Sequence, residues 1–407
     1  MRKKPITIWM FSAYDQPNGN SSRTDEFAYF LSQHLHEVKF ITNNFCHFKK
    51  TYTKKVFFLW TEEKFKNYKA VWLKTSSYDS NIGFLRIVNM WQNAYKTFLY
   101  AMFSKGKPDV IIAPSVPITL GFVACVIAKI LGCRIIYEIR DLWPEILVDI
   151  GAIRRNNILF KILKRLELFI YRNCDAIVST LPNVADYIKL NTKQNILIEY
   201  IPNGIVPKKL KINKNKTRKS LKTKKIMYFG GYGLDHDIET ILKSAKILKL
   251  KHNNKFVFLL YGDGPKKDRM KLFAKQEKID NVFFNQPVPK EKIPYFSKTA
   301  DLLLVAITDS PSYRFGINLN KILSYFMCMK PILFAGNVTN NPVKAACAGL
   351  CVPAGSPEKM ASAIEKVFSL RACHRLRMAQ NGYNFALKNL HINILGEKYL
   401  RLLNCLN

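Results

Sequence analysis

The sequence predicts an α/β protein built from two doubly wound domains. Its 407 residues exceed what one ordinary core holds, so two domains of roughly 200 residues each are expected. Short apolar runs alternate with helix-like stretches through both halves of the chain, which is typical of a parallel sheet with helices on both faces. A basic stretch interrupts this alternation. Ten of the eighteen residues 208–225 are Lys or Arg and none is acidic, as in a solvated linker.

The first half contains five apolar runs that predict strands. They lie at residues 6–11, 38–42, 110–113, 134–138 and 176–179. Between them the clearest predicted helices lie at residues 24–34, 118–131 and 158–171. The turn Pro202-Asn203-Gly204 follows, so we place the end of the first domain at residue 205.

The second half repeats this alternation after the basic stretch. Its predicted strands lie at residues 225–229, 256–261, 282–284, 302–306, 331–335 and 350–353. Its predicted helices lie at residues 238–250, 266–276, 319–327, 357–370 and 371–385. The second domain is therefore expected at residues 206–385, and residues 386–407 are expected to form a C-terminal helix that crosses back to the first domain.

The composition excludes a mostly disordered chain, because 48% of the residues are hydrophobic and 13% are aromatic. The formal net charge of +35 fits a partner with negative charge: a nucleic acid, an anionic membrane face or a phosphorylated small molecule. The nine cysteines form no Cys-x-x-Cys pair, which fits small buried residues in a reducing cytoplasm. The longest apolar stretch, residues 118–131, is too short to span a bilayer, so a soluble or peripheral protein is expected.

The octet at residues 138–145 places charged side chains at the end of a predicted strand. Because ligands bind outside the carboxyl ends of strands in open α/β sheets, these side chains are candidates for a site. They are Glu138, Arg140, Asp141 and Glu145. The same spacing also fits a salt-bridged strand-to-helix turn in which Pro144 opens the helix.

Glycine-rich turns follow predicted strands in both halves. Gly230-Gly231-Tyr232-Gly233 lies between a strand and a helix that starts near Asp237, and such a turn suits a phosphate at the helix N-terminus. A tight turn without a ligand fits equally well. The turn at residues 262–265 favours a structural role, and the loop at residues 18–22 matches no phosphate-binding motif.

Lys321 lies in the first turn of a short predicted helix, where the helix dipole disfavours a cation. This placement is understandable if an anion sits at the helix start and Lys321 binds it. Without an anion, Lys321 is a surface lysine in an unfavourable place.

The whole chain resembles retaining family 4 glycosyltransferases of the GT-B fold, in which two Rossmann-like domains face each other across a cleft. It is most similar to bacterial enzymes that transfer N-acetyl-fucosamine-type sugars during O-antigen or capsule assembly. The stretches that carry the resemblance occur in family order along nearly the full length. They are the N-terminal loop with Arg23, residues 138–145, residues 201–204, and the second-half series at 230–233, 262–265, 320–325, 336 and 348–349.

The resemblance implies an enzyme that moves a sugar from a nucleotide-diphosphate donor, with UDP as the nucleotide. It implies that the leaving diphosphate takes the acceptor proton, so the protein stabilises charge on that diphosphate. Neither a metal nor a further cofactor is implied, and we identify no Asp-x-Asp motif of the metal-dependent GT-A type. The implied catalytic residues are Glu138, Arg140, Asp141 and Lys321. The implied donor-binding residues are Gly19, Gly230, Gly233, Gly264, Val288, Asn320, Lys321 and Ser324.

Three positions depart from the family pattern. Ser324 stands where many members have a glutamate that contacts the ribose, and Gly316 stands at the place of a second glutamate. Serine can still bond a hydroxyl group, but without charge assistance. Arg140 occupies the region where many relatives have a histidine near the donor sugar, and an arginine cannot act as a base.

The resemblance also implies an acceptor sugar on a polyprenyl diphosphate, and hence an anionic membrane surface as partner on the cytoplasmic side. Residues 153–171 combine apolar and basic side chains at helical spacing, which suits an amphipathic helix on such a surface. A helix packed on the core with a charged outer face fits the same pattern.

Two alternatives from other classes remain at this point. A nucleotide-sugar 2-epimerase could share the fold. A basic nucleic-acid-binding protein would fit the sequence pI of about 9.8, but the chain has no helix-turn-helix, zinc-finger or RNA-binding motif. The basic stretch at 208–225 also lacks aromatic residues to stack bases. We therefore expect no nucleic-acid partner.

Overall fold

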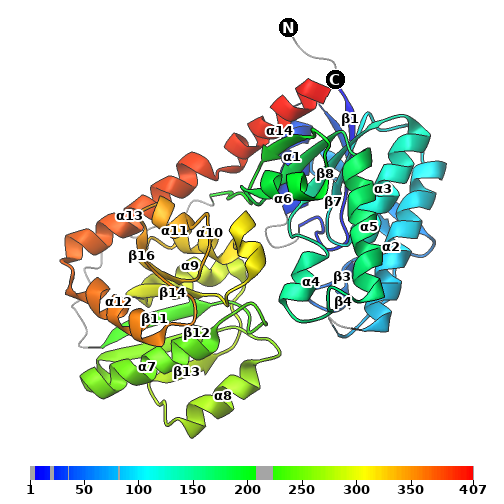
Figure 1. The fold of residues 1–407 in the computed structure, drawn as a ribbon. Coiled ribbons are helices and arrows are strands. Elements are labelled where there is room, and N and C mark those ends of the chain that lie inside the picture. The colour runs from blue at the N-terminus through cyan, green and yellow to red at the C-terminus, as the bar shows by residue number, and fades with distance from the viewer. Residues whose placement is uncertain (1–4, 19–22, 35, 81–82, 208–222, 407) are drawn as a thin grey trace. The chain divides into compact units, whose positions relative to one another are not determined.

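The computed structural model describes residues 5–18, 23–34, 36–80, 83–207 and 223–406 (Figure 1). The chain divides into two compact units. The first comprises Met1–Gly204 together with Ile392–Asn407, and the second comprises Ile205–His391. Each unit is a largely parallel sheet with helices on both faces, so the predicted α/β class is confirmed.

The sheet of the first unit has the strand order β10-β9-β8-β7-β1-β2-β6-β5, and every described pairing is parallel except β5 with β6. Its strands are β1 (Thr7–Phe11), β2 (Glu37–Asn43), β5 (Trp60–Phe65), β6 (Tyr68–Leu73), β7 (Val110–Pro114), β8 (Arg134–Ile139), β9 (Ala176–Ser179) and β10 (Leu197–Tyr200). A separate short hairpin pairs β3 (Phe45–Cys46) with β4 (Thr51–Tyr52).

Helices cover both faces of this sheet. The helices of the first unit are α1 (Arg23–Gln33), α2 (Phe84–Phe103), α3 (Ile118–Leu131), α4 (Glu145–Asp149), α5 (Ile158–Asn173), α6 (Val184–Asn191) and α14 (Ile392–Leu406). α1 and α14 pack together over one core, in which the Phe27 and Tyr399 rings are 4.7 Å apart. α2, α3 and α5 lie side by side (Figure 1), and Tyr100 of α2 packs on Trp9 of β1.

The sheet of the second unit is parallel throughout, in the order β13-β12-β11-β14-β15-β16. Its strands are β11 (Lys224–Phe229), β12 (Phe256–Tyr261), β13 (Val282–Asn285), β14 (Leu302–Ala306), β15 (Ile332–Ala335) and β16 (Gly349–Val352). Both faces of these strands are apolar and buried, as expected for a sheet covered on two sides.

The helices of the second unit form two layers. They are α7 (Ile238–His252), α8 (Lys267–Gln276), α9 (Ile293–Phe296), α10 (Asn320–Met327), α11 (Pro342–Ala345), α12 (Pro357–Ser369) and α13 (Ala372–Asn389), with short 3₁₀ turns at Asn253–Lys255, Lys290–Lys292, Ser297–Thr299 and Pro311–Phe315. α7 and α12 pack against each other on one face, and α10 packs against α9 and α13 on the other.

The predicted strands and helices are present, with ends that differ by up to four residues, except that the C-terminal helix begins at Ile392, six residues later than expected. Several elements were missed, among them α2, α6, β5, β6 and β10. α2 reverses the usual amphipathic pattern, because its polar residues Asn89, Asn93 and Thr97 lie on the buried side while large apolar residues are exposed. The sheet-edge strand β5 is largely polar.

The amphipathic helix predicted within residues 153–171 is present, as α5. α5 buries Phe160, Ile170 and Tyr171, so most of its apolar stripe packs on the core of the first unit. Only its first turns expose apolar side chains, at Ile158 and Ile162 among others. The alternative of a core-packed helix with a charged outer face describes the later turns of α5, and a membrane contact of its first turns stays a prediction. In the described residues, no helix combines the length and apolar character that a membrane span requires.

Candidate functional site

Each unit has a point where the chain reverses its direction across the sheet. In the first unit β1 lies between β2 and β7, and in the second β11 lies between β12 and β14. Loops that leave the carboxyl ends of two such neighbouring strands diverge and leave a crevice in which ligands bind. The predicted site residues are best judged against these two places.

In the second unit the glycine turn after β11 packs directly on the turn after β12. The Gly230 amide donates to the Tyr261 carbonyl at 3.0 Å, and the Tyr232 amide donates to the Asp263 carbonyl at 2.9 Å. Gly262 has φ of +156°, and a Cβ there would overlap the carbonyl oxygen of Gly230. Glycine is therefore required at 262, and the predicted residues Gly230, Gly233 and Gly264 share these two paired turns.

Lys321 reaches the same turn from α10. Its ammonium donates to the Tyr228 hydroxyl at 3.0 Å and lies 4.5 Å from the centre of the Tyr228 ring. A Cβ at Gly230 would come within 2.6 Å of the Lys321 Nζ atom. The absence of a side chain at 230 is thus what admits the lysine, and the structure brings together two residues that are about ninety positions apart in sequence.

The ammonium of Lys321 is poorly solvated. Burial lowers its pKa from 10.5 to about 7, and the Asp235 carboxylate opposes this shift only in part. Asp235 is itself paired with His236, whose Nδ1 lies 2.7 Å from Oδ1. A lysine in this state gains charge when an anion arrives beside it, because an opposite charge favours the protonated form.

Tyr325 fixes α10 against the glycine turn. Its hydroxyl accepts from the Phe229 amide at 2.7 Å and donates to the Phe229 carbonyl at 3.2 Å. This pair of bonds sets the register of Lys321 and Ser324 relative to the end of β11. Ser324 is 7% exposed, on the buried side of the helix.

The remaining predicted donor residues of the second unit lie nearby in sequence or on its core. Asn320 is exposed at the first position of α10, and Val288 packs against the core from the loop after β13. Gly316 has φ of +107°, a backbone conformation in which a glutamate would be strained. The backbone of the loop before α10 therefore favours glycine at position 316 over the glutamate of the family pattern. Gly19 lies outside the described residues.

In the first unit, Glu138 is the centre of a buried ion-pair network. Its carboxylate forms ion pairs with Arg23 Nε at 2.9 Å and with Arg140 Nε at 2.7 Å. The hydroxyl of Tyr399 in α14 donates a hydrogen bond to the same carboxylate. Burial alone would raise the pKa of Glu138, but the charges of Arg23 and Arg140 hold it at about 2. Glu138 is therefore a permanent carboxylate that holds two arginines.

The network continues from Arg140 to the loop after β1. Arg140 Nη1 donates to Asp15 at 2.7 Å, and Arg140 Nη2 donates to the Thr24 hydroxyl at 2.8 Å. Burial would raise the pKa of Asp15, but the Arg140 charge and the bonds from Thr24 keep it below its usual value. Arg140 is 22% exposed, so part of its guanidinium remains open at the carboxyl edge of the sheet.

The octet divides into two groups. Glu138 and Arg140 belong to the network, whereas Glu145 pairs with Arg155 at 3.0 Å and with Lys164 at 3.5 Å. The side chain of Asp141 is exposed, and its backbone carbonyl accepts from the Ser115 hydroxyl at 3.2 Å. The salt-bridged turn that the spacing also allowed is therefore present, and it holds Arg140 in place.

Sequence reasoning missed Asp15, Thr24 and Tyr399. Asp15 lies in the loop that was considered, and it could have been recognised as a counterion for Arg140. Tyr399 is 261 residues from Glu138, and no local signal connects the two.

A second missed group gathers aromatic rings and cations at the same edge. The Tyr14 and His47 rings are 4.7 Å apart, and the His47 Nδ1 lies 2.5 Å from the Tyr78 hydroxyl. Arg86 of α2 donates to the Tyr14 hydroxyl at 3.1 Å, and Lys50 lies 4.3 Å from the centre of the Tyr78 ring. Burial and these two cations lower the pKa of His47 to about 4, so the imidazole is neutral.

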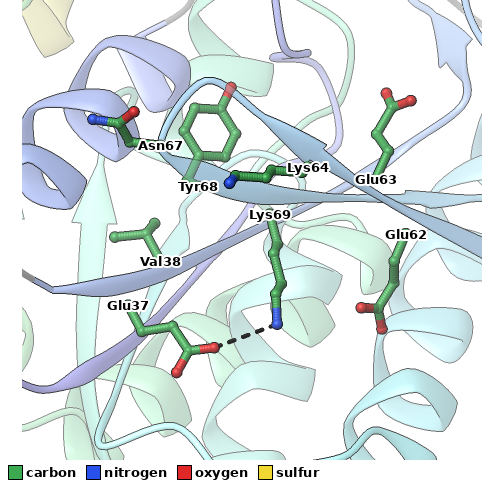
Figure 2. Close-up of a pocket in the computed structure, with 8 residues that line it drawn as sticks. All are labelled: Glu37, Val38, Glu62, Glu63, Lys64, Asn67, Tyr68 and Lys69. Carbon is green, nitrogen blue, oxygen red and sulfur yellow. Dashed lines mark ion pairs between the residues drawn. The ribbon is translucent and has the colours of Figure 1, made fainter.

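A pocket of about 370 Å³ lies elsewhere in the first unit (Figure 2). Its walls come from the first residues of β2 and β6 and from β5, with an ion pair of 3.6 Å between Lys69 and Glu37. These are the amino ends of the parallel strands, opposite to the edge at which such sheets bind ligands. The pocket is therefore separate from the predicted site.

The comparison with protein families concerns the unit that holds Lys321. Residues 211–385 match the family described as "Glycosyl transferases group 1", and this match covers most of the second unit. The chain carries a group 1 glycosyltransferase domain. The predicted enzyme class is thereby confirmed, and the glycine turn, Lys321 and α10 all lie inside the matched residues of this glycosyltransferase.

Known proteins extend the similarity to both units. The probable glycosyltransferase WbjE of Pseudomonas aeruginosa is 23% identical over 289 residues, which cover 68% of this glycosyltransferase and 71% of WbjE. Sucrose-phosphate synthase of Thermosynechococcus elongatus has a TM-score of 0.71 at 13% identity, covering 98% of this chain and 99% of that one. HepE of Anabaena in complex with UDP has a TM-score of 0.69 at 13% identity, covering 98% and 100%.

These likenesses give the GT-B fold, as the resemblance implied. They favour neither the nucleic-acid-binding class nor the epimerase.

Proposed function

We propose that this glycosyltransferase moves a sugar from a UDP-sugar to a lipid-linked sugar acceptor in bacterial surface-polysaccharide assembly, with retention of the anomeric configuration. The observation that carries the donor half is Lys321, whose ammonium is held against the Gly230 turn with a pKa of about 7. The structure of HepE in complex with UDP supports the choice of nucleotide.

In the proposed reaction the bond between the anomeric carbon and the diphosphate oxygen breaks, and a bond from the acceptor hydroxyl oxygen to that carbon forms on the same face. The acceptor proton passes to the leaving diphosphate. Lys321 and the backbone amides of the Gly230 turn stabilise the charge that develops there. Val288, Asn320 and Ser324 are assigned to the rest of the donor, with Ser324 at the ribose.

The residues of the first unit are assigned to the sugar and the acceptor. Arg140 is clamped by Asp15 and Glu138, so it offers a fixed guanidinium face rather than a base. The group around His47 supports an acceptor that combines sugar and phosphate, because aromatic rings pack on sugar faces while Arg86 and Lys50 attract phosphate. We also propose Asp141 and Gly19 as site residues.

A screen of nucleotide-sugars by thermal shift tests the donor class, since a ligand of the native state raises the melting temperature by mass action. The expected result is stabilisation by UDP and by at least one UDP-sugar. An assay with a lipid-linked acceptor should then release UDP and yield a product with the donor's anomeric configuration by NMR. Conversion of the UDP-sugar into its 2-epimer without an acceptor would contradict transfer.

The affinity for UDP is expected to fall as the pH rises above about 7. Bound diphosphate raises the pKa of Lys321, so binding takes up a proton at a pH between the free and bound values. The dissociation constant should then rise by up to about tenfold per pH unit. Calorimetry from pH 7 to 9, above the titration of the phosphate itself near pH 6, measures this slope. A flat profile for the native enzyme, or an equal slope in Lys321→Gln, would exclude Lys321 as the titrating group.

Ser324→Glu is expected to keep or tighten UDP binding, because a carboxylate bonds ribose hydroxyls more strongly than a serine does. Ser324→Gln is the matched control, since it adds similar volume without charge. Dissociation constants and melting temperatures are measured for both variants. If the Glu variant is folded yet binds UDP far more weakly than the Gln variant, Ser324 is not at the ribose.

A further inference from the structure

The outer face of α2 exposes a continuous row of large apolar side chains. Phe84, Ile87, Trp91 and Tyr95 follow one another at intervals of three or four residues, so they share one helix face. Their exposed fractions are 76%, 50%, 53% and 59%. The buried side of α2 carries Asn89, Asn93 and Thr97. Tyr100 of that side packs on Trp9 of the sheet, so the exposed apolar row takes no part in this contact.

A loop with the same character lies beside this helix. Phe57 and Phe58 are 70% and 84% exposed, and Leu59 follows them. Lys74 joins the two segments, because its ammonium donates to the Phe57 carbonyl at 3.1 Å while its own carbonyl accepts from Lys96 of α2. We call the exposed residues of both segments the α2 surface: Phe57, Phe58, Leu59, Phe84, Ile87, Trp91 and Tyr95.

The two segments that form the α2 surface are basic, although two carboxylates of β5 lie beside them: Glu62 accepts from Tyr100 of α2, and Glu63 pairs with Lys54. Neither residues 45–61 nor residues 84–108 contain Asp or Glu. These two segments carry Lys49, Lys50, Lys54, Lys55, Arg86, Lys96, Lys105 and Lys107. Lys54 is paired with Glu63, whereas Lys55 lies over the Phe57 ring at 4.9 Å. The α2 surface is therefore apolar and aromatic with a basic border.

This combination distinguishes between possible occupants. A second copy of the chain would bring the lysines of one copy against those of the other if the same surface met itself. An anionic bilayer satisfies both parts: Trp, Tyr and Phe insert at the headgroup level, and lysines pair with lipid phosphates. Large apolar side chains that are exposed together on a folded unit mark an interaction surface.

We propose that the first unit docks on an anionic lipid bilayer through the α2 surface, and not through α5. This inference rests on the proposed function, because it supplies the membrane in which a lipid-linked acceptor resides. α2 also begins at the carboxyl edge of the sheet, where Arg86 donates to Tyr14. A bilayer against α2 therefore delivers the phosphate of such an acceptor to the group around His47.

Co-sedimentation of the full chain with vesicles tests the proposal. Binding to vesicles of phosphatidylglycerol and phosphatidylcholine is expected, with little binding to phosphatidylcholine alone. It should weaken as salt rises from about 0.1 M to 0.5 M, where the Debye length falls by about half. The triple variant Phe58→Ser, Trp91→Ser, Tyr95→Ser should lose at least about tenfold in partitioning.

The matched control is the triple variant Ile158→Ser, Leu159→Ser, Ile162→Ser, which removes the apolar side chains that α5 exposes. Its partitioning should change by less than about twofold. Loss of binding in the α5 variant but not in the α2 variant would overturn the proposal, as would equal binding to neutral vesicles or none to either. So would gel filtration that shows a native dimer converted to a monomer by the α2 variant, without an effect on vesicles.

Binding of UDP by thermal shift separates this inference from the proposed function. The α2 variant should keep the native stabilisation by UDP and the native melting temperature, since its three positions are exposed. If the native protein binds vesicles through the α2 surface but binds neither UDP nor UDP-sugars, only the proposed function is contradicted. If the native protein binds UDP but no vesicles, only the proposed docking on the bilayer is contradicted.

Discussion

Replacing Lys321 with alanine is expected to lower turnover by about 30- to 1000-fold. The reason is that one charge-assisted contact to a developing negative charge contributes about 2–4 kcal/mol to the transition state. The ammonium lies against the Gly230 turn and the Tyr228 hydroxyl, at the carboxyl end of β11. Steady-state rates with a UDP-sugar and a lipid-linked acceptor measure the effect.

Lys344→Ala is the matched control, because it removes an exposed lysine from the short helix α11 of the same unit. It should leave both turnover and UDP binding near the native values. Circular dichroism and the melting temperature must be unchanged in both variants for the comparison to hold. Native turnover in a folded Lys321→Ala variant would remove this residue from the mechanism.

Replacing Glu138 with glutamine is expected to destabilise the first unit by about 3–5 kcal/mol, because two buried arginines lose the carboxylate that neutralises them. The expected loss is large because Glu138 and Arg23 are only 3% and 5% exposed. Urea unfolding with a probe in the first unit measures it. In the native protein the pKa of about 2, against 4.5 when unfolded, means that this stabilisation is complete above about pH 4.5 and is lost as the pH falls toward 2.

Glu145→Gln provides the comparison for Glu138→Gln. Glu145 also has two basic partners, but Arg155 is 67% exposed, and Lys164 keeps a second carboxylate partner in Glu167 at 2.7 Å. Its replacement should cost no more than about 1 kcal/mol. If both variants lose a similar free energy of unfolding, burial does not determine how much the Glu138 network contributes to stability.

Most of the fold was predictable because apolar runs and turn residues are local signals. The strands at 256–261 and 302–306 were predicted to the residue, since each is a short apolar run bounded by turns. α2 was not predicted, because it departs from the rule that the apolar side of a helix is buried. Its buried side carries Asn89, Asn93 and Thr97, while large apolar side chains remain exposed.

The candidate site was predictable where a short stretch of sequence shows both an unusual charged residue and an unusual backbone requirement. The unfavourable place of Lys321 in a first helical turn and the glycines after β11 each suggested an anion, and the structure joins them through Gly230. The clamp on Arg140 was not predictable, because Asp15, Glu138 and Tyr399 come from three distant parts of the chain. Only the packing of α14 on α1 brings Tyr399 to Glu138.

That packing gives the two units different histories during synthesis. Residues 392–406 leave the ribosome after the whole of the second unit, yet they supply Leu395, Tyr399 and Leu403 to the core of the first. Until those residues dock, the face of the first sheet beside α1 is only partly covered, and Glu138 lacks the Tyr399 hydroxyl. The unit translated first is thus completed last, and during this interval its uncovered apolar surface is open to aggregation.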